Sequence, residues 1–292
     1  MRLPKFRLFD YTTPGPGVEK DAPPKKGIAL FFDIFWRRFW KLVSINAIFF
    51  AFSIPALILS WILTYALSTF ALSTLPEFEI NDSLAVGITL ISVFASCFFT
   101  SMFGTGAPTA AMTYVIRNYR EDTHAWVWAD FWQTFKEKFL KATGVYIIDT
   151  VFVCLLTVNF CVYGSLAAGY ANSLSVEYIG FSLLQGLMVV IFLVLLLMHC
   201  YVYPILITTD DSLFRIYRNS FILALGKLPQ TLLSTLICTL FTGAVIVLSC
   251  MFPIFGLVFV PVIMFAFNCY INLFVTYPIV KKYRLSSKER DL

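Results

Sequence analysis

Charged residues are scarce in this sequence. Lys, Arg, Asp and Glu together make up 13% of the 292 residues, against about 25% in an ordinary soluble domain. Hydrophobic residues make up 59%, with 31 Phe among them, and the mean hydropathy is +0.79. A soluble fold of this length could not enclose so much apolar surface. The composition therefore excludes a disordered chain, a secreted disulfide scaffold and a basic nucleic-acid-binding domain. It indicates an all-α membrane protein with several spans.

The motifs of the common enzyme classes and metal sites are also missing. The sequence has no P-loop, no nucleophile elbow, no zinc-protease helix and no dinucleotide-binding glycine pattern. Only two His are present, and the seven Cys form neither a CxxC pair nor a metal-ligand spacing. We therefore expect no enzymatic activity, no cofactor and no metal. Any work on a solute would need an ion gradient or a separate ATPase.

Long stretches without charge predict the membrane spans, because a helix needs about 20 apolar residues to cross the hydrocarbon layer. The last stretch, from Leu228 to Val280, is too long for one crossing and is expected to break near Cys250–Pro253. We therefore predict six transmembrane helices in three hairpins, near residues 43–70, 84–116, 143–164, 179–207, 229–250 and 255–279.

The basic residues lie on one predicted side of the membrane. All 22 Lys and Arg fall in the N-terminal tail, the loops 117–141 and 210–228, or the C-terminal tail. The loops on the opposite side carry acidic charges and no basic residue. By the positive-inside rule, both termini are expected in the cytoplasm. The net charge of +5 then reflects this topology and contact with anionic lipid headgroups, and nucleic acid is not expected as a partner.

The chain divides into a Pro-rich cytosolic tail (1–27), a six-helix transmembrane domain (28–284) and a short cytosolic C-terminal tail (285–292). The first tail holds five Pro and three Gly, a composition typical of extended, polyproline-like chain. It is either a flexible tail or a strap that lies along a partner.

Three segments with a shared aromatic and basic pattern precede the odd-numbered spans, at 31–41, 131–141 and 217–227. Each has apolar residues at i, i+4 and i+8 and a Lys at i+10, which predicts an amphipathic interfacial helix. The chain therefore resembles three units of interfacial helix and hairpin, through internal repetition or through convergence. The residues expected to contact a partner or lipid are Arg37, Arg38, Trp40, Trp132, Lys136 and Lys138.

Two ionisable residues lie inside predicted spans. Asp149 comes eight residues after Lys141, about 12 Å into the bilayer at about 1.5 Å per residue, and His199 lies at a similar depth in the next helix. An unpaired carboxylate at this depth is costly. We predict that Asp149 pairs with His199, directly or through one water, with Asn46 and Asn272 nearby as further members of a polar site. Alternatively, each residue separately hydrogen-bonds a neighbouring helix.

The second span holds a helix break at Gly104, Gly106 and Pro108. Pro108 lacks an N–H and blocks the carbonyl of Gly104. The break is either a kink whose small residues pack against a neighbouring helix or a broken helix that lines a solute site.

The same residues carry a family resemblance. The block from Thr105 to Ala111, then Arg117, then Asp130 to Phe139, together with Phe39–Leu42 and Asn46, resembles the YesL-like family. This is a family of bacterial integral membrane proteins whose domain has no known function. The likeness extends from about Phe31 to the last span, although the family's usual Gly-Pro-Ala order is Gly-Ala-Pro here.

The resemblance implies a protein of the bacterial plasma membrane with an accessory role in carbohydrate uptake. Its implied partners are permease subunits of a sugar ABC importer or a membrane signalling protein, and the family supplies no established catalytic or binding residues. Two other functions fit the sequence: a self-sufficient secondary solute carrier, and a structural or lipid-organising membrane protein. A carrier should have a polar central cavity, whereas an accessory subunit should have an apolar outward face and no continuous pathway.

Overall fold

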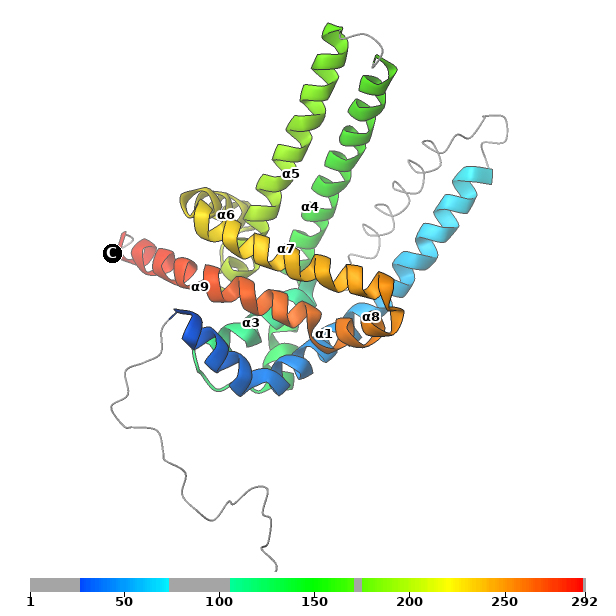
Figure 1. Ribbon diagram of the computed structural model, residues 1–292. Coiled ribbons are helices and arrows are strands. Elements are labelled where there is room, and N and C mark those ends of the chain that lie inside the picture. Colours follow the sequence, from blue (N-terminus) through cyan, green and yellow to red (C-terminus); the bar gives the residue numbers. More distant parts are fainter. Residues whose placement is uncertain (1–26, 74–105, 171–174, 291–292) are drawn as a thin grey trace, which may run out of the picture. The chain divides into compact units, whose positions relative to one another are not determined.

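The computed structural model describes residues 27–73, 106–170 and 175–290 (Figure 1). Within these residues the chain forms helices and no strand. Most of the Pro-rich tail, the larger part of the predicted second span, and Gly104 lie outside them. Residues up to Arg37 and residues from Arg38 onward form two compact units, and the described part of the first is the opening of helix α1.

Two of the three aromatic–basic segments are continuous with the spans that follow them. Helix α1 runs from Gly27 to Ser73 and helix α4 from Val127 to Gly169, so each joins an amphipathic segment to a span without interruption. The prediction of separate interfacial helices at 31–41 and 131–141 is therefore wrong. No Pro or Gly separates segment from span in either helix, so nothing interrupts the backbone hydrogen bonds.

The third aromatic–basic segment does form its own helix. Helix α6 runs from Leu213 to Gly226 and helix α7 from Leu228 to Met251, with Lys227 between them at φ −126° and ψ 36°. Pro229 explains the break, because it has no N–H to donate to the carbonyl of Leu225 and its ring clashes with that carbonyl.

The predicted break near residues 250–253 is confirmed. Helix α7 ends at Met251, and Phe252 takes an extended conformation (φ −133°, ψ 87°) before helix α8, Pro253–Phe259. The residue before a proline is pushed toward such a conformation by the proline ring. A π-helix, η2 (Val260–Met264), then leads into helix α9 (Phe265–Arg290), which continues into the residues assigned to the C-terminal tail.

The π-helix is held by a side chain from α1. The Asn46 amide nitrogen donates to the carbonyls of Val260 and Pro261 at 3.0 and 2.7 Å, and its Oδ1 accepts from the Ala266 N–H at 2.8 Å. Asn46 is completely buried. It therefore satisfies backbone groups that the widened turn leaves without their usual helical partners.

Two more helices complete the described fold: α3 (Gly106–Arg120) and α5 (Val176–Thr208). Helix α3 packs on α4, α4 and α5 form a long hairpin, and α7 runs beside α9 (Figure 1). The buried core between α3, α4, α5 and α6 includes Ala110, Val145, Tyr201, Leu206 and Ile216.

Five segments of the described chain are long and apolar enough to cross a membrane, namely those in α1, α4, α5, α7 and α8 through α9. They correspond to five of the six predicted spans, and the sixth is described only from Gly106 onward. The all-α, multi-span fold class is thus confirmed, while the number six and the cytoplasmic termini stay predictions.

Candidate functional site

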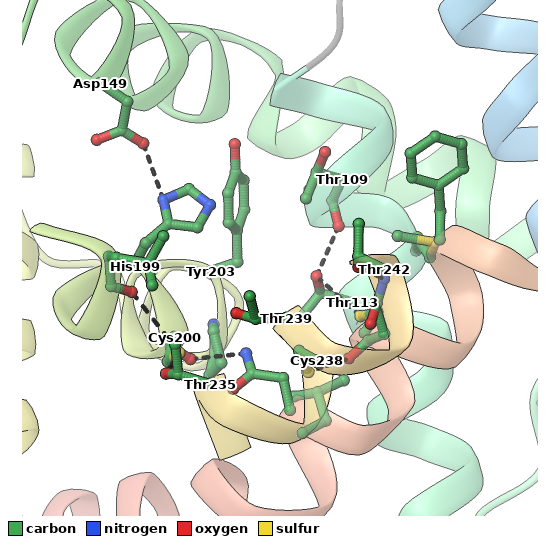
Figure 2. Close-up of a pocket in the computed structure, with 18 of the residues that line it drawn as sticks. Thr109, Thr113, Asp149, His199, Cys200, Tyr203, Thr235, Cys238, Thr239 and Thr242 are labelled. Atoms are coloured by element: carbon green, nitrogen blue, oxygen red, sulfur yellow. Dashed lines mark hydrogen bonds and ion pairs between the residues drawn. The ribbon is translucent and has the colours of Figure 1, made fainter. Parts of the chain in front are cut away.

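A cavity of about 810 Å³ lies among α3, α4, α5, α7 and α9, with Phe49 of α1 on its wall (Figure 2). Small-molecule sites in proteins measure about 300–1,000 Å³ and are mostly apolar with a few placed polar groups. This cavity has that character, because aliphatic and aromatic side chains alternate with polar ones. The polar lining residues are Thr109, Thr113, Asp149, His199, Cys200, Tyr203, Thr235, Cys238, Thr239, Thr242, Asn268, Cys269 and Asn272.

The two ionisable residues predicted to meet inside the membrane are in direct contact on this wall. His199 Nδ1 lies 3.0 Å from Asp149 Oδ2, and a dashed line marks this ion pair in Figure 2. The contact forms because α4 and α5 are antiparallel neighbours that bring the two residues to the same level. The Asp149 side chain is 17% exposed and the His199 ring 50%, so the carboxylate is withdrawn while the imidazole faces the cavity.

A third partner of the carboxylate comes from α6. The Tyr217 hydroxyl lies 2.7 Å from Asp149 Oδ1, to which it donates, and 3.1 Å from the Val145 carbonyl. Both Asp149 oxygens therefore face a polar partner, which offsets the cost of removing a carboxylate from water. The sequence pattern had assigned Tyr217 only to the apolar face of an amphipathic helix. Its hydroxyl could have indicated this contact, since a buried Tyr hydroxyl usually has a hydrogen-bond partner.

Tyr203 extends this polar cluster toward α3. Its ring meets the His199 ring edge-to-face, with the centroids 5.4 Å apart, and its hydroxyl is hydrogen-bonded to the Thr109 side chain. The Thr113 hydroxyl lies one turn further along α3 and donates to the Thr109 carbonyl at 2.6 Å. The polar groups thus cross from α4 through α5 to α3 along one side of the cavity.

The two predicted asparagines lie in different places. Asn272 lines the cavity, where its amide donates to the Cys200 carbonyl at 2.9 Å and its Oδ1 accepts from Ser234 at 3.3 Å. Asn46 does not line it, so including Asn46 in the polar site is wrong. The physical reason is that the π-helix has unpaired carbonyls, and Asn46 is the side chain that satisfies them.

The predicted helix break falls in the first turn of α3, where Gly106 and Pro108 are both buried. A Cβ on Gly106 would lie 2.3 Å from the Ala142 carbonyl oxygen, so α3 approaches the α4 backbone too closely for any side chain. This is the close packing of small residues that the sequence allowed. One turn later, Thr109 lines the cavity, so the same helix end serves both packing and the cavity wall.

The residues expected to contact a partner or lipid divide into two groups. Arg38 and Lys138 make ion pairs within the fold, with Asp122 at 3.1 Å and Asp210 at 2.8 Å. The Lys138 ammonium is the main cause that holds the pKa of Asp210 below its usual range. The others, Arg37, Trp40, Trp132 and Lys136, are exposed.

Trp132 belongs to an aromatic cluster on α4. Its ring is nearly parallel to those of Trp128 and Phe135, with interplanar angles of 6° in both pairs. Phe52 of α1 contacts the same rings, with its centroid 5.9 Å from that of Trp132. The Lys136 ammonium lies 4.7 Å above the Trp132 ring. Such a cluster of rings and cations suits the headgroup layer of a membrane.

Among the residues that the structure describes, no three His, Cys, Asp or Glu side chains are grouped as metal ligands. The cavity is therefore described by its hydrogen-bonding groups and by the Asp149–His199 pair. The arrangement can hydrogen-bond a polar solute.

Residues 84–160 match the model of a family described as "Protein of unknown function, DUF624". The matched region includes α3 and the greater part of α4, and with them Asp149. No curated protein and no solved structure matches the chain. The match confirms the resemblance to YesL-like proteins: the chain is a helical membrane protein whose residues 84–160 match the model of the DUF624 family, a family of unknown function.

Proposed function

We propose that this protein is a non-enzymatic component of carbohydrate uptake in the bacterial plasma membrane, where it works beside a sugar ABC importer and binds a small solute. The observation that carries the solute-binding part is the cavity with its polar wall. The sugar, the importer and the plasma membrane come from the resemblance to YesL-like proteins. The proposed partners are permease subunits of the importer or a membrane signalling protein.

The chemistry of the cavity fits an uncharged polar solute. Among the described residues that line it, Asp149 and His199 are the only acidic or basic side chains, and they neutralise each other when His199 is protonated. The remaining polar groups are the hydroxyls of the Thr residues and Tyr203, the Asn amides and three Cys thiols, and the hydroxyls and amides can both donate and accept hydrogen bonds. A sugar needs such groups for its hydroxyls, and its C–H faces can pack on rings such as Phe192 and Phe265.

The test is ligand binding to the purified full chain in lipid nanodiscs, with a panel of radiolabelled monosaccharides and disaccharides. Thr235→Val and Thr239→Val each keep the side-chain shape and remove one cavity hydroxyl. We expect binding of at least one sugar and a weaker affinity in both variants. Thr157→Val is the matched control, because its hydroxyl bonds its own helix at the Val153 carbonyl and lies outside the cavity. Absence of binding to every sugar would contradict the proposal.

The importer partnership is tested by affinity purification in mild detergent with mass spectrometry. Arg37 and Lys136 are chosen for charge reversal because both are exposed, whereas Arg38 and Lys138 make ion pairs with Asp122 and Asp210. We expect Arg37→Glu with Lys136→Glu to remove permease subunits from the purified material while the protein stays folded. If the variant keeps all its partners, neither residue is needed for docking.

A self-sufficient proton-coupled carrier is the second candidate, and the Asp149–His199 pair on the cavity wall favours it. Proteoliposomes that contain only this protein separate the two functions. A carrier takes up sugar in response to an imposed pH gradient, and Asp149→Asn abolishes that uptake while binding persists. An accessory protein binds sugar in the same liposomes and shows no uptake. A structural or lipid-organising protein shows neither.

The proposed orientation places both termini in the cytoplasm, since the basic residues gather at one side of the spans. In a background without the native Cys, a membrane-impermeant thiol reagent should not reach a Cys at position 122. It should reach a Cys at Ser83 or Asn172, which lie outside the described residues. Labelling of position 122 from outside the cell would overturn the orientation.

A further inference from the structure

A second recess, of about 420 Å³, lies between α6 and the end of α9, next to the connection from α5 to α6. Three arginines line it, two from α6 and one from α9. They are accompanied by the polar side chains of Thr209, Asn219 and Tyr283. Nothing in the proposed sugar function uses this recess, which is separate from the central cavity in all its lining residues.

The fold directs these groups to one place. Arg215, Arg218 and Asn219 are spaced by three and four residues on α6 and therefore share a face of that helix. Arg284 comes from α9, one residue after Tyr283. Asn219 is only 6% exposed, and its Oδ1 accepts from the Tyr283 hydroxyl at 3.2 Å. Asn219 lines the recess and carries an NH₂ group with two hydrogen-bond donors.

The charge of the recess is positive. Asp211 is the one carboxylate among the described residues of its lining, against three guanidinium groups. The neighbouring carboxylate of Asp210 is bonded to Lys138, and Lys141 donates to the Asp210 and Asp211 carbonyls at 2.9 and 3.2 Å. Lys138 thus offsets the Asp210 carboxylate, on which Arg284 also acts, and the lining of the recess keeps two more guanidinium groups than carboxylates.

We infer that this recess binds a phosphate group. Guanidinium groups match the oxygens of phosphate as planar, two-pronged donors, and here hydroxyl and amide donors stand beside them. The phosphate could belong to a phospholipid headgroup or to a soluble phosphate ester. The exposed apolar side chains of α6 favour the lipid, because acyl chains can pack on them next to the arginines. These side chains are Phe214, Phe221, Ile222 and Leu225.

The test measures ligand retention by native mass spectrometry on the purified full chain in a neutral detergent. Short-chain phosphatidylglycerol and glucose 6-phosphate are the two phosphate probes, and diacylglycerol and glucose are their matched neutral compounds. We expect at least one phosphate probe to bind more tightly than its neutral counterpart. Retention of phosphatidylglycerol alone identifies a lipid site, and retention of glucose 6-phosphate alone identifies a soluble ester.

Variants locate the binding. Arg215→Gln with Arg218→Gln should weaken binding of the phosphate probe about ten-fold, since two guanidinium groups are lost. Lys227→Gln with Lys282→Gln is the control, because it removes the same charge from the end of α6 and from α9 at residues outside the lining. Arg215→Lys with Arg218→Lys keeps the charge and therefore controls for misfolding of the Gln variant. It should bind the phosphate probe with intermediate affinity. Equal weakening in the Gln pair and the control, or no preference for either phosphate probe over its neutral counterpart, would overturn the site.

Discussion

The segments 131–141 and 217–227 have the same pattern of apolar positions and a closing Lys, yet they fold differently. The first continues into a span as part of α4, whereas the second ends at Gly226 and is followed by the separate helix α7. The pattern fixes which face of a helix is apolar, because that depends only on spacing. Whether the helix continues depends on a few backbone-active residues, and Pro229 is the one that matters here.

The difference has a structural consequence for the candidate site. Because α6 is a separate helix, it can pack against α5 and bring Tyr217 to Asp149 of α4. The corresponding part of α4 instead carries the aromatic cluster and receives Gly106 of α3 at its backbone. The same sequence pattern thus supplies a hydrogen-bond partner for the buried carboxylate in segment 217–227 and a packing surface in segment 131–141.

Leu140→Pro should have the largest effect, since it gives α4 the kind of break that separates α6 from α7. The side chain of Leu140 is 83% exposed, so the change acts on the backbone alone. A proline inside a helix costs about 3 kcal/mol or more. We expect a large fall in melting temperature in detergent, and little change for Leu140→Ala. An unchanged melting temperature in the Pro variant would show that the segment and the span are not one helix.

Gly106→Ala tests the close packing of α3 against the backbone of α4. The added methyl would meet the Ala142 backbone, which cannot move aside like a flexible side chain. Overpacking of this kind costs about 1–3 kcal/mol. The control is Gly243→Ala on α7, where a Cβ meets nothing within 4 Å, and there the helix should gain about 0.5–1 kcal/mol. Thermal unfolding of the two variants in parallel should give shifts of opposite sign.

Tyr217→Phe removes the bond that only the separated helix α6 can make. Hydrogen bonds to charged groups contribute about 1.5–3 kcal/mol, and this one is partly buried, so we expect a loss near the lower value. The comparison variant is Tyr283→Phe, whose hydroxyl donates to the neutral Asn219 amide and should matter less. A double-mutant cycle with Asp149→Asn should show coupling between the two sites, and strict additivity would mean that the bond does not stabilise the protein.

The smallest effect is expected from the ion pair that links α4 to the start of the α6 region, Lys138 with Asp210. The Lys138 ammonium lowers the pKa of Asp210 from its ordinary 3.8, so the stabilisation is present above that value and disappears as the pH falls through the lower, folded pKa. Asp210 is 90% exposed, which keeps the contribution slight. Asp210→Asn should therefore lower the melting temperature a little at pH 7, and not at pH 2 or at about 1 M salt.

The sequence predicts the features that depend on composition and local order. Charge-free length located the five spans found in the described residues, Pro253 located the break before α8, and the cost of a buried carboxylate predicted the contact of Asp149 with His199. Tertiary contacts decided the rest. Asn46 looked like a member of the polar site because it lies within a span, but its role follows from carbonyls on a helix more than 200 residues away. The cavity itself arises from the packing of α3, α4, α5, α7 and α9, which no local pattern encodes.

The π-helix at Val260–Met264 determines which face of the following helix, α9, is turned toward the cavity. One extra residue in a turn rotates the rest of a helix by about 100°, since a full α-helical turn takes about 3.6 residues. Asn268 and Asn272 stand one turn apart on α9 and both face the cavity. Without the extra residue, the same two amides would be rotated away and a different face of α9 would form the wall. The polarity of the cavity therefore depends on an offset in the helix, which Asn46 holds in place.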